Sequence, residues 1–166
     1  MHEPVRRVAA IALGSNLSSE RGDREANLRE AVRRVGQLGE IRIISSFYDT
    51  APIGYTEQPR FLNGAMLLET VLEPLALMRE LLTIERAMGR DRAAAPPKGP
   101  RVIDLDLLLM GEVVMNSDGL TLPHPAMAER RFVLEPLAEI APEMVHPLSG
   151  LTVRQMLARL NNPDHG

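Results

Sequence analysis

The order of hydrophobic and polar positions predicts strands and helices along most of the chain. Short apolar or β-rich runs predict strands at residues 8–13, 41–48, 65–71 and 102–110. Apolar residues at helical spacing predict helices at residues 23–38, 74–88 and 153–160. Residues 131–140 are typical of short helices interrupted at Pro136, and residues 111–122 predict a small hairpin. Gly14 to Asn16 predict the turn that ends the first strand, and Pro123-His124-Pro125 predicts a rigid corner.

The order β-α-β, β-α-β and then a helical tail predicts a ferredoxin-like fold. We expect an α/β (α+β) sandwich, with a mainly antiparallel sheet and helices packed on it. The 166 residues fit one catalytic domain, residues 1–166. No run reaches the roughly 18 apolar residues of a membrane helix, and the run at 8–13 is short for a signal sequence. We therefore expect a soluble, cytoplasmic protein with no membrane partner.

Composition excludes several classes of chemistry. The chain has no cysteine, which excludes a disulfide scaffold, a thiolate nucleophile and a zinc–sulfur site. A net charge of −3 argues weakly against a nucleic-acid partner. As a separate expectation, the protein is a monomer. No P-loop motif and no Gly-x-Gly-x-x-Gly occurs, which excludes those two nucleotide sites.

Asp104 and Asp106 are the sharpest chemical feature of the sequence. In an extended strand they share one face about 6.8 Å apart, while Ile103, Leu105, Leu107 and Leu109 share the other. Two adjacent carboxylates repel, and a cation between them removes that cost. All-oxygen ligands suit Mg²⁺, which also bridges to substrate phosphates. A solvated pair of acids on an exposed strand face is the alternative, although aspartate is depleted in strands.

Basic residues precede the acid pair in a loop rich in proline and glycine. From Glu85 to Arg101, five basic residues stand against two acidic ones. Charge balance alone explains such a cluster, but a complex of polyphosphate with Mg²⁺ requires the same charges. His124, held between two prolines, is a candidate ligand contact. Phe61 and Asn63 lie two residues apart, so that a ring can stack on a flat heterocycle while an amide binds its edge; one core ring and one turn amide is the alternative.

The sequence resembles a known family through motifs that occur in order along the chain. They are Gly14-Ser15-Asn16-Leu17, the stretch from Ser45 to Gly54, Gln58 to Asn63, Glu85, the stretch from Gly99 to Asp106, Leu122 to Pro125, and Arg130 to Pro142. On these residues the chain is similar to the 6-hydroxymethyl-7,8-dihydropterin pyrophosphokinases of the folate pathway. The resemblance covers roughly residues 8 to 148. It implies transfer of pyrophosphate from ATP to a hydroxymethyl-dihydropterin, with release of AMP.

The resemblance implies a role for particular residues in binding ATP and metal. Asp104 and Asp106 would hold two Mg²⁺ ions, and Arg90 and Arg92 would join them as catalytic residues. The remaining residues implied at the ATP site are Glu85, Lys98, Arg101, Leu107, Thr121, His124, Pro125 and Arg130.

The resemblance also implies a pterin site. Phe61 and Phe132 would sandwich the pterin, and its polar edge would be bound by Thr50, Ala51, Ile53, Gly54 and Asn63. Loops 51–60 and 90–99 would close over both substrates.

Two other functions remain open from the residues alone. One is another Mg²⁺-dependent nucleotidyl- or glycosyltransferase with an Asp-x-Asp pair, which would release pyrophosphate or a nucleoside diphosphate. The other is a ferredoxin-like ligand-binding module without catalysis, which would need neither the acid pair nor the basic loop.

Overall fold

One antiparallel sheet forms the centre of the molecule. The computed structural model describes residues 4–17, 19, 22–50, 60–89 and 102–161. The sheet has the strand order β2-β4-β1-β5, and the short β3 pairs with β4. Its strands are β1 (Arg7–Ser15), β2 (Glu40–Ile44), β3 (Tyr48–Thr50), β4 (Phe61–Thr70) and β5 (Asp104–Met110). Each of the pairings between them is antiparallel.

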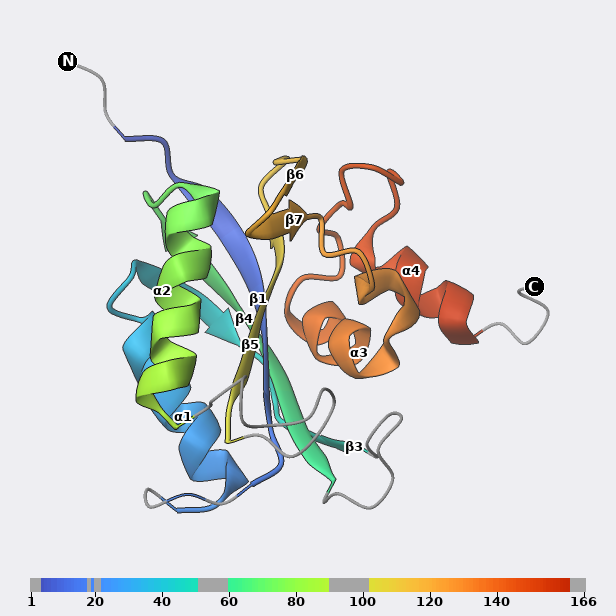
Figure 1. Cartoon of the computed structure of the whole chain (residues 1–166). Coiled ribbons are helices and arrows are strands. Elements are labelled where there is room, and N and C mark those ends of the chain that lie inside the picture. The colour runs from blue at the N-terminus through green and yellow to red at the C-terminus, as the bar shows by residue number, and fades with distance from the viewer. Residues whose placement is uncertain (1–3, 18, 20–21, 51–59, 90–101, 162–166) are drawn as a thin grey trace.

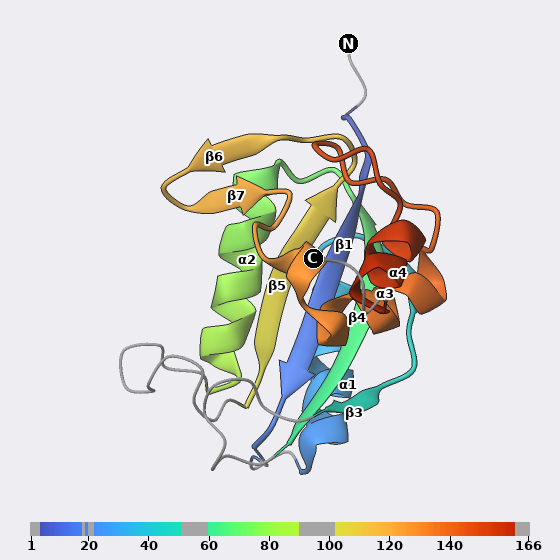
Figure 2. The same cartoon turned by 90° about the vertical axis from the view of Figure 1, so that its right-hand side faces the viewer.

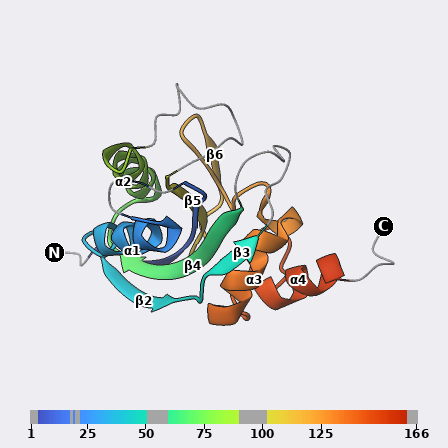
Figure 3. The same cartoon turned by 90° about the horizontal axis from the view of Figure 1, so that it is seen from below.

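Helices lie on both faces of this sheet (Figure 1). They are α1 (Arg24–Val35), α2 (Pro74–Ala87), α3 (Arg131–Ile140) and α4 (Val153–Asn161). Figure 3, seen from below, shows α1 and α2 on one side and α3 and α4 on the other. A hairpin of β6 (Met115–Ser117) and β7 (Leu120–Leu122) follows β5, and Figure 2 shows it above the end of that strand.

The topology confirms the predicted ferredoxin-like sandwich. Two β-α-β units, β1-α1-β2 and β4-α2-β5, place β1 and β4 in the centre and β2 and β5 at the edges. The helical tail, α3 and α4, adds a further layer on the face that α1 and α2 leave open. Within the described ranges, no helix is long and apolar enough to cross a membrane.

The predicted strand at 41–48 is wrong in extent, because the structure divides it into β2 and β3. Ser45 lies at the break, where its hydroxyl accepts a hydrogen bond from Ala65 N (2.8 Å) and donates one to Ser46 O (2.7 Å). Such side-chain bonding competes with the regular ladder. The break lets β3 pair with the start of β4, which begins at Phe61 and not at residue 65.

The predicted turn at Gly14 is wrong as well, because β1 continues to Ser15. Gly14 is paired on both sides, with Asn63 of β4 and Asp104 of β5, so neighbouring strands hold it in the ladder. The interruption predicted at Pro136 is also wrong, since α3 runs through it. Pro136 removes only the bond to the carbonyl of residue 132, which lies in the first turn of the helix.

A bulge in β5 decides which side of the sheet its residues face. Ile11 lies opposite Leu107 but Ala10 lies opposite Leu109, so Leu108 is the extra residue. Leu105 and Leu107 pack toward α1 and α2 as predicted, whereas Leu109 packs in the cluster beneath α3. The prediction that Leu109 shares their face is wrong, because strict alternation makes no allowance for a bulge.

Candidate active site

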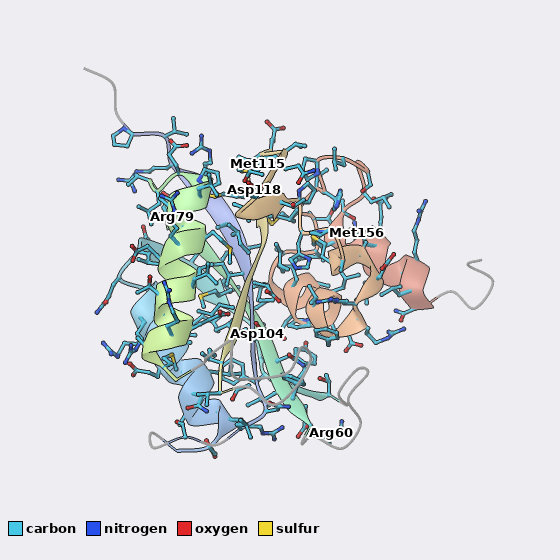
Figure 4. All side chains as sticks on the ribbon, viewed as in Figure 1. Arg60, Arg79, Asp104, Met115, Asp118 and Met156 are labelled. Carbon is cyan, nitrogen blue, oxygen red and sulfur yellow. The ribbon has the colours of Figure 1, made fainter. Side chains whose placement is uncertain are left out.

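Register places the predicted site residues of three strands on one face of the sheet. Asp104 of β5 lies opposite Gly14 of β1, and Gly14 lies opposite Asn63 of β4. Directly paired residues point to the same side of an antiparallel sheet, and adjacent strands lie about 4.8 Å apart. The backbones of Asp104 and Asn63 are therefore about 10 Å apart on the face beneath α3. Figure 4 labels Asp104 on β5.

Gly14 lies in the middle of this row, and its lack of a side chain leaves room for the neighbouring side chains of β4. A Cβ at Gly14 would lie 2.9 Å from Asn63 Oδ1 and 3.6 Å from Phe61 Cδ1. Real Cβ atoms almost never approach a neighbour as closely as the first of these distances, so any side chain here would displace the amide. The Asn63 amide and the Phe61 ring therefore lie over β1 in space that a side chain at position 14 would take.

Asn63, Phe61 and Thr50 form the part of the site contributed by β3 and β4. Thr50 lies directly opposite Phe61. Asn63 is 6% exposed, and its Nδ2 donates a hydrogen bond to Thr50 Oγ1. This bond fixes the orientation of the amide, so Oδ1 is the acceptor that lies over Gly14. The predicted pairing of a ring and an amide on one strand face is confirmed in its geometry.

Asp104 and Asp106 share the face beneath α3 and are both half-buried. The register sets Asp104 opposite Gly14 and Asp106 opposite Ala12, so small residues lie beside both acids. No group of three or more His, Cys, Asp or Glu occurs within the described ranges, so no cage made only of protein ligands is seen there. Two carboxylates suit Mg²⁺, which usually keeps several waters and takes phosphate oxygens as further ligands. The donor set therefore fits Mg²⁺ bound together with a phosphorylated substrate.

Glu85 and Leu107 lie on the other side of the sheet from the acids. Leu107 is 2% exposed in the core against α1 and α2. Glu85 on α2 is 1% exposed, and its Oε2 accepts a hydrogen bond from the backbone N–H of Leu105 (2.7 Å). Leu105 lies between the two acids, so Glu85 supports β5 at the acid pair. A contact of either side chain with a nucleotide stays a prediction.

The corner at His124 is fastened to β5. His124 N–H donates to Leu108 O (2.9 Å), and His124 Nδ1 accepts a hydrogen bond from Ala126 N (3.2 Å). In the neutral ring this places the proton on Nε2, which is then a donor. Burial lowers the pKa of His124, the charge of Arg130 lowers it further, and Asp104 acts against both. The predicted rigid corner thus holds a histidine that favours its neutral form, close enough to Arg130 and Asp104 to feel their charges.

The other described candidates lie on the hairpin, on the corner and at the start of α3. The Arg130 guanidinium lies over the Phe132 ring, with Cζ 5.8 Å from the ring centroid, a cation–π distance. Thr121 Oγ1 donates to Asn116 Oδ1 within the hairpin (3.1 Å), and Pro125 is exposed. Seven further candidates lie outside the described residues: Ala51, Ile53, Gly54, Arg90, Arg92, Lys98 and Arg101.

An ion-pair cluster joins α1, β3 and the residue before β4: Arg24, Asp49 and Arg60. Asp49 in β3 accepts a hydrogen bond from Arg24 Nη2 (3.1 Å) and another from Arg60 Nε (2.8 Å). Arg24 Nη1 also donates to Arg60 O (2.8 Å), and Figure 4 labels Arg60 just before β4. Arg24 first and then Arg60 hold the pKa of Asp49 below its usual value.

Sequence reasoning missed the roles of Gly14 and of the Asp49 cluster. Gly14 had a signal, since it lies in the first of the matching motifs, but a glycine after an apolar run also predicts a turn. Asp49 and Arg60 also lie in matching motifs, but no local pattern connects them with Arg24, because their proximity depends on the pairing of β3 with β4.

Comparison with known proteins assigns the chain to a family. Residues 10–142 match the model of 7,8-dihydro-6-hydroxymethylpterin-pyrophosphokinase (HPPK). The chain is 43% identical over 155 residues to the 2-amino-4-hydroxy-6-hydroxymethyldihydropteridine pyrophosphokinase of Methylorubrum extorquens, covering 92% of this chain and 93% of that protein. It is also 43% identical over 139 residues to the Bacillus subtilis protein of the same name, covering 82% and 80%.

Longer proteins match as well. The Schizosaccharomyces pombe folic acid synthesis protein fol1 is 37% identical over 156 residues, which is 93% of this chain and 20% of that protein. The chain thus spans about a fifth of that relative's length. The solved Plasmodium falciparum HPPK-DHPS, wild type with pteroate, superposes with a TM-score of 0.71 at 15% identity, over 96% of this chain and 43% of the other. That likeness shows the fold, and with the family match it leads to one conclusion: the chain belongs to the 7,8-dihydro-6-hydroxymethylpterin-pyrophosphokinase family.

Proposed function

We propose that this chain transfers pyrophosphate from ATP to the hydroxymethyl group of 6-hydroxymethyl-7,8-dihydropterin and releases AMP, in folate biosynthesis. The row Asp104–Gly14–Asn63 carries the proposal. It sets an acid suited to a cation–phosphate complex about 10 Å from an amide suited to the edge of a heterocycle. The names of the bacterial relatives, which cover most of this chain, support the same reaction.

On the pterin side, we propose that Asn63 and Thr50 bind the polar edge of the ring. Their mutual hydrogen bond orients the Asn63 amide before the substrate arrives, which reduces the entropy lost on binding. Phe61 and Phe132 form the two walls of the slot. Residues 51, 53 and 54 complete it from the segment between β3 and β4.

On the nucleotide side, we propose that cationic and polar groups surround the phosphates. His124, with its proton on Nε2, donates one hydrogen bond, and Arg130 leaves the Phe132 ring to bind a phosphate oxygen. The other groups proposed at the ATP site are Glu85, Arg90, Arg92, Lys98, Arg101, Leu107, Thr121 and Pro125.

We propose that Asp104 and Asp106 hold Mg²⁺, two ions in the full complex. When bound, the metal neutralises phosphate charge and lowers the pKa of a coordinated hydroxyl. The residues of this chain then position the two substrates and exclude water, which is most of what phosphoryl-type transfer requires. We also propose that Asp106 accepts the proton of the substrate hydroxyl.

One assay tests the proposal. The protein is incubated with ATP, Mg²⁺ and 6-hydroxymethyl-7,8-dihydropterin, and the nucleotide products are separated. AMP together with the pterin pyrophosphate supports the proposed reaction. Free pyrophosphate or a nucleoside diphosphate as product would indicate another transferase, and unchanged ATP would indicate a binding module.

We propose further that the chain acts in the cytoplasm as a monomer and without nucleic acid. Light scattering during turnover measures the oligomeric state, and a dimer that persists at assay concentrations would contradict the monomer.

A further inference from the structure

Glu139, near the end of α3, fastens this helix to the segment that enters β3. The Tyr48 hydroxyl donates a hydrogen bond to Glu139 Oε1 (2.7 Å). The Ser46 N–H and hydroxyl both donate to Glu139 Oε2, at 2.9 and 3.0 Å. Both oxygens of one carboxylate are thus bound by residues more than 90 positions earlier in the chain. All three residues lie in the matching motifs, and the proposed reaction gives none of them a role.

This junction lies next to the proposed pterin slot. Tyr48 is directly opposite Asn63 in the ladder, and Thr50 follows two residues later on the same face. On α3, Phe132 lies seven residues before Glu139, which is two turns, so both occupy the same side of the helix about 10 Å apart along its axis. Figures 1 and 3 both show β3 beside α3.

The charge states favour the three hydrogen bonds of this junction, which lies at the protein surface. The Glu139 carboxylate raises the pKa of Tyr48 to about 12, so the phenol stays a donor. The hydrogen bond from Tyr48, followed by that from Ser46 N–H, holds the pKa of Glu139 below its usual value. Hydrogen bonds to a charged acceptor are shorter and stronger than neutral ones.

Directional bonds add what apolar packing leaves undefined. Beneath α3, the helix contributes Val133, Leu134 and Leu137 to the core, and apolar burial of this kind is not directional. Three convergent hydrogen bonds fix the position of the helix relative to β3.

We propose that Glu139 is a positioning residue for the pterin, because its bonds to Tyr48 and Ser46 set the spacing between Phe132 on α3 and Asn63 on β4. The inference rests on the proposed function, since it assigns the pterin to this slot. Glu139 and Tyr48 do not contact the substrate themselves; they act through the positions of Phe132 and Asn63.

The test compares Glu139→Ala and Tyr48→Phe with Glu135→Ala. Glu135 is the control because it is an acid on the same helix whose ion pair, with Arg131 (3.6 Å), stays within that helix, and it acts on Tyr48 through its charge alone. A net contribution of about 1 kcal/mol for the Tyr48 hydrogen bond predicts a rise of about five-fold in pterin KM for Tyr48→Phe. Glu139→Ala removes all three hydrogen bonds and should raise the pterin KM further, by more than about ten-fold. The kcat at saturating pterin stays within about two-fold, and Glu135→Ala behaves like wild type. The KM for ATP rises less than the pterin KM, because of the ATP groups only Arg130 adjoins the same helix.

Two further variants separate positioning from general destabilisation. Glu139→Gln keeps one acceptor oxygen and recovers part of the pterin KM. The double variant Tyr48→Phe/Glu139→Ala is no worse than Glu139→Ala alone, because both remove the same bond. Thermal unfolding of every variant is followed in parallel.

Two kinds of failure remain distinguishable. Wild-type protein that produces no AMP overturns the proposed function. Active wild type with an unchanged pterin KM in Tyr48→Phe and Glu139→Ala overturns the inference, and so does a rise shared equally by the KM for ATP or by Glu135→Ala.

Discussion

The two faces of the sheet differ in chemistry although the same strands build both. Toward α1 and α2, these strands present large aliphatic side chains that are almost completely buried: Ile11, Leu13, Met66, Leu68, Leu105 and Leu107. On the face toward α3, the same strands contribute Leu109 and other apolar residues to the cluster under that helix. They also present a row of small and polar residues there: Ala12, Gly14, Ala65, Asn63, Asp104 and Asp106. One face is filled with apolar volume, and the other carries the groups that the proposed chemistry needs.

The difference shows how a small domain can hold two acids and an amide beside its core. Burying polar groups costs free energy, which the filled face offsets by apolar burial of about 25 cal/mol per Å². Glu85 is an exception on the apolar side, because it is a buried acid. Its carboxylate accepts a hydrogen bond from the Leu105 N–H and so supports the strand between Asp104 and Asp106. Variants on the two faces should therefore separate activity from stability.

The largest effect is expected from Asp106→Ala on the polar face. Loss of a carboxylate that binds Mg²⁺ should lower kcat by about 1,000-fold, or roughly 4 kcal/mol of transition-state stabilisation. The free energy of unfolding is measured alongside, because relief of the repulsion between the two carboxylates opposes the loss of the interaction that Asp106 makes. AMP release at saturating Mg²⁺ and urea unfolding measure the two quantities.

Asp118→Ala is the matched control for that variant, since it removes an exposed aspartate from the turn between β6 and β7. It should leave kcat unchanged. Near-normal turnover of Asp106→Ala would show that the acid pair is not the metal site.

Leu13→Ala on the filled face should show the reverse pattern. Leu13 is 2% exposed in the core against α1 and α2, so its truncation should cost about 3 kcal/mol of unfolding free energy. At a temperature where the variant is still folded, both KM values should stay near those of wild type. A selective rise in pterin KM would show that the faces are not independent.

The sequence predicted the sandwich and the placement of the acid pair because both depend on local periodicity. Alternation at residues 103–107 assigned Asp104 and Asp106 to one face, and the structure agrees. Alternation failed at Leu109, because a bulge depends on how β1 pairs with β5 and not on local pattern. It failed at Ser45 for a related reason: the side chain there replaces a ladder bond through contact with Ala65, twenty residues away.

The family resemblance supplied roles that the residues alone left open, but it did not explain how those residues are held in place. Thr50 and Asn63 were expected at the pterin, yet their mutual hydrogen bond requires β3, whereas the strand predicted from the sequence ended at residue 48. Glu139 and Tyr48 are 91 positions apart, so no local pattern connects them.

The next largest effect is expected from Gly14→Ala, which changes the polar face at the residue directly after Leu13 of the filled face. Leu13 and Gly14 face opposite sides, and a Cβ at Gly14 would lie 2.9 Å from Asn63 Oδ1. Displacing the amide should raise the pterin KM about ten-fold, equivalent to about 1.4 kcal/mol. Stability should fall by about 1 kcal/mol, because the displaced amide loses its hydrogen bond to Thr50. Unchanged pterin KM would exclude Asn63 from the pterin contacts.

The smallest effect is expected from a charge on the outer side of α1, remote from both inner faces. Glu30 binds Arg33 first and Arg34 second, which lowers its pKa from 4.5 to about 2. A carboxyl whose folded pKa lies below its unfolded value adds stability above pH 4.5 and loses it as the pH falls toward 2. Glu30→Gln should therefore reduce the loss of unfolding free energy between pH 6 and pH 3 by less than about 1 kcal/mol, as expected for an exposed ion pair.

Glu80→Gln, which changes an exposed acid on α2, controls for net charge. Both variants should keep wild-type kinetics at pH 7. A changed pterin KM in Glu30→Gln would mean that charge outside the sandwich reaches the polar face, against the separation of the two faces.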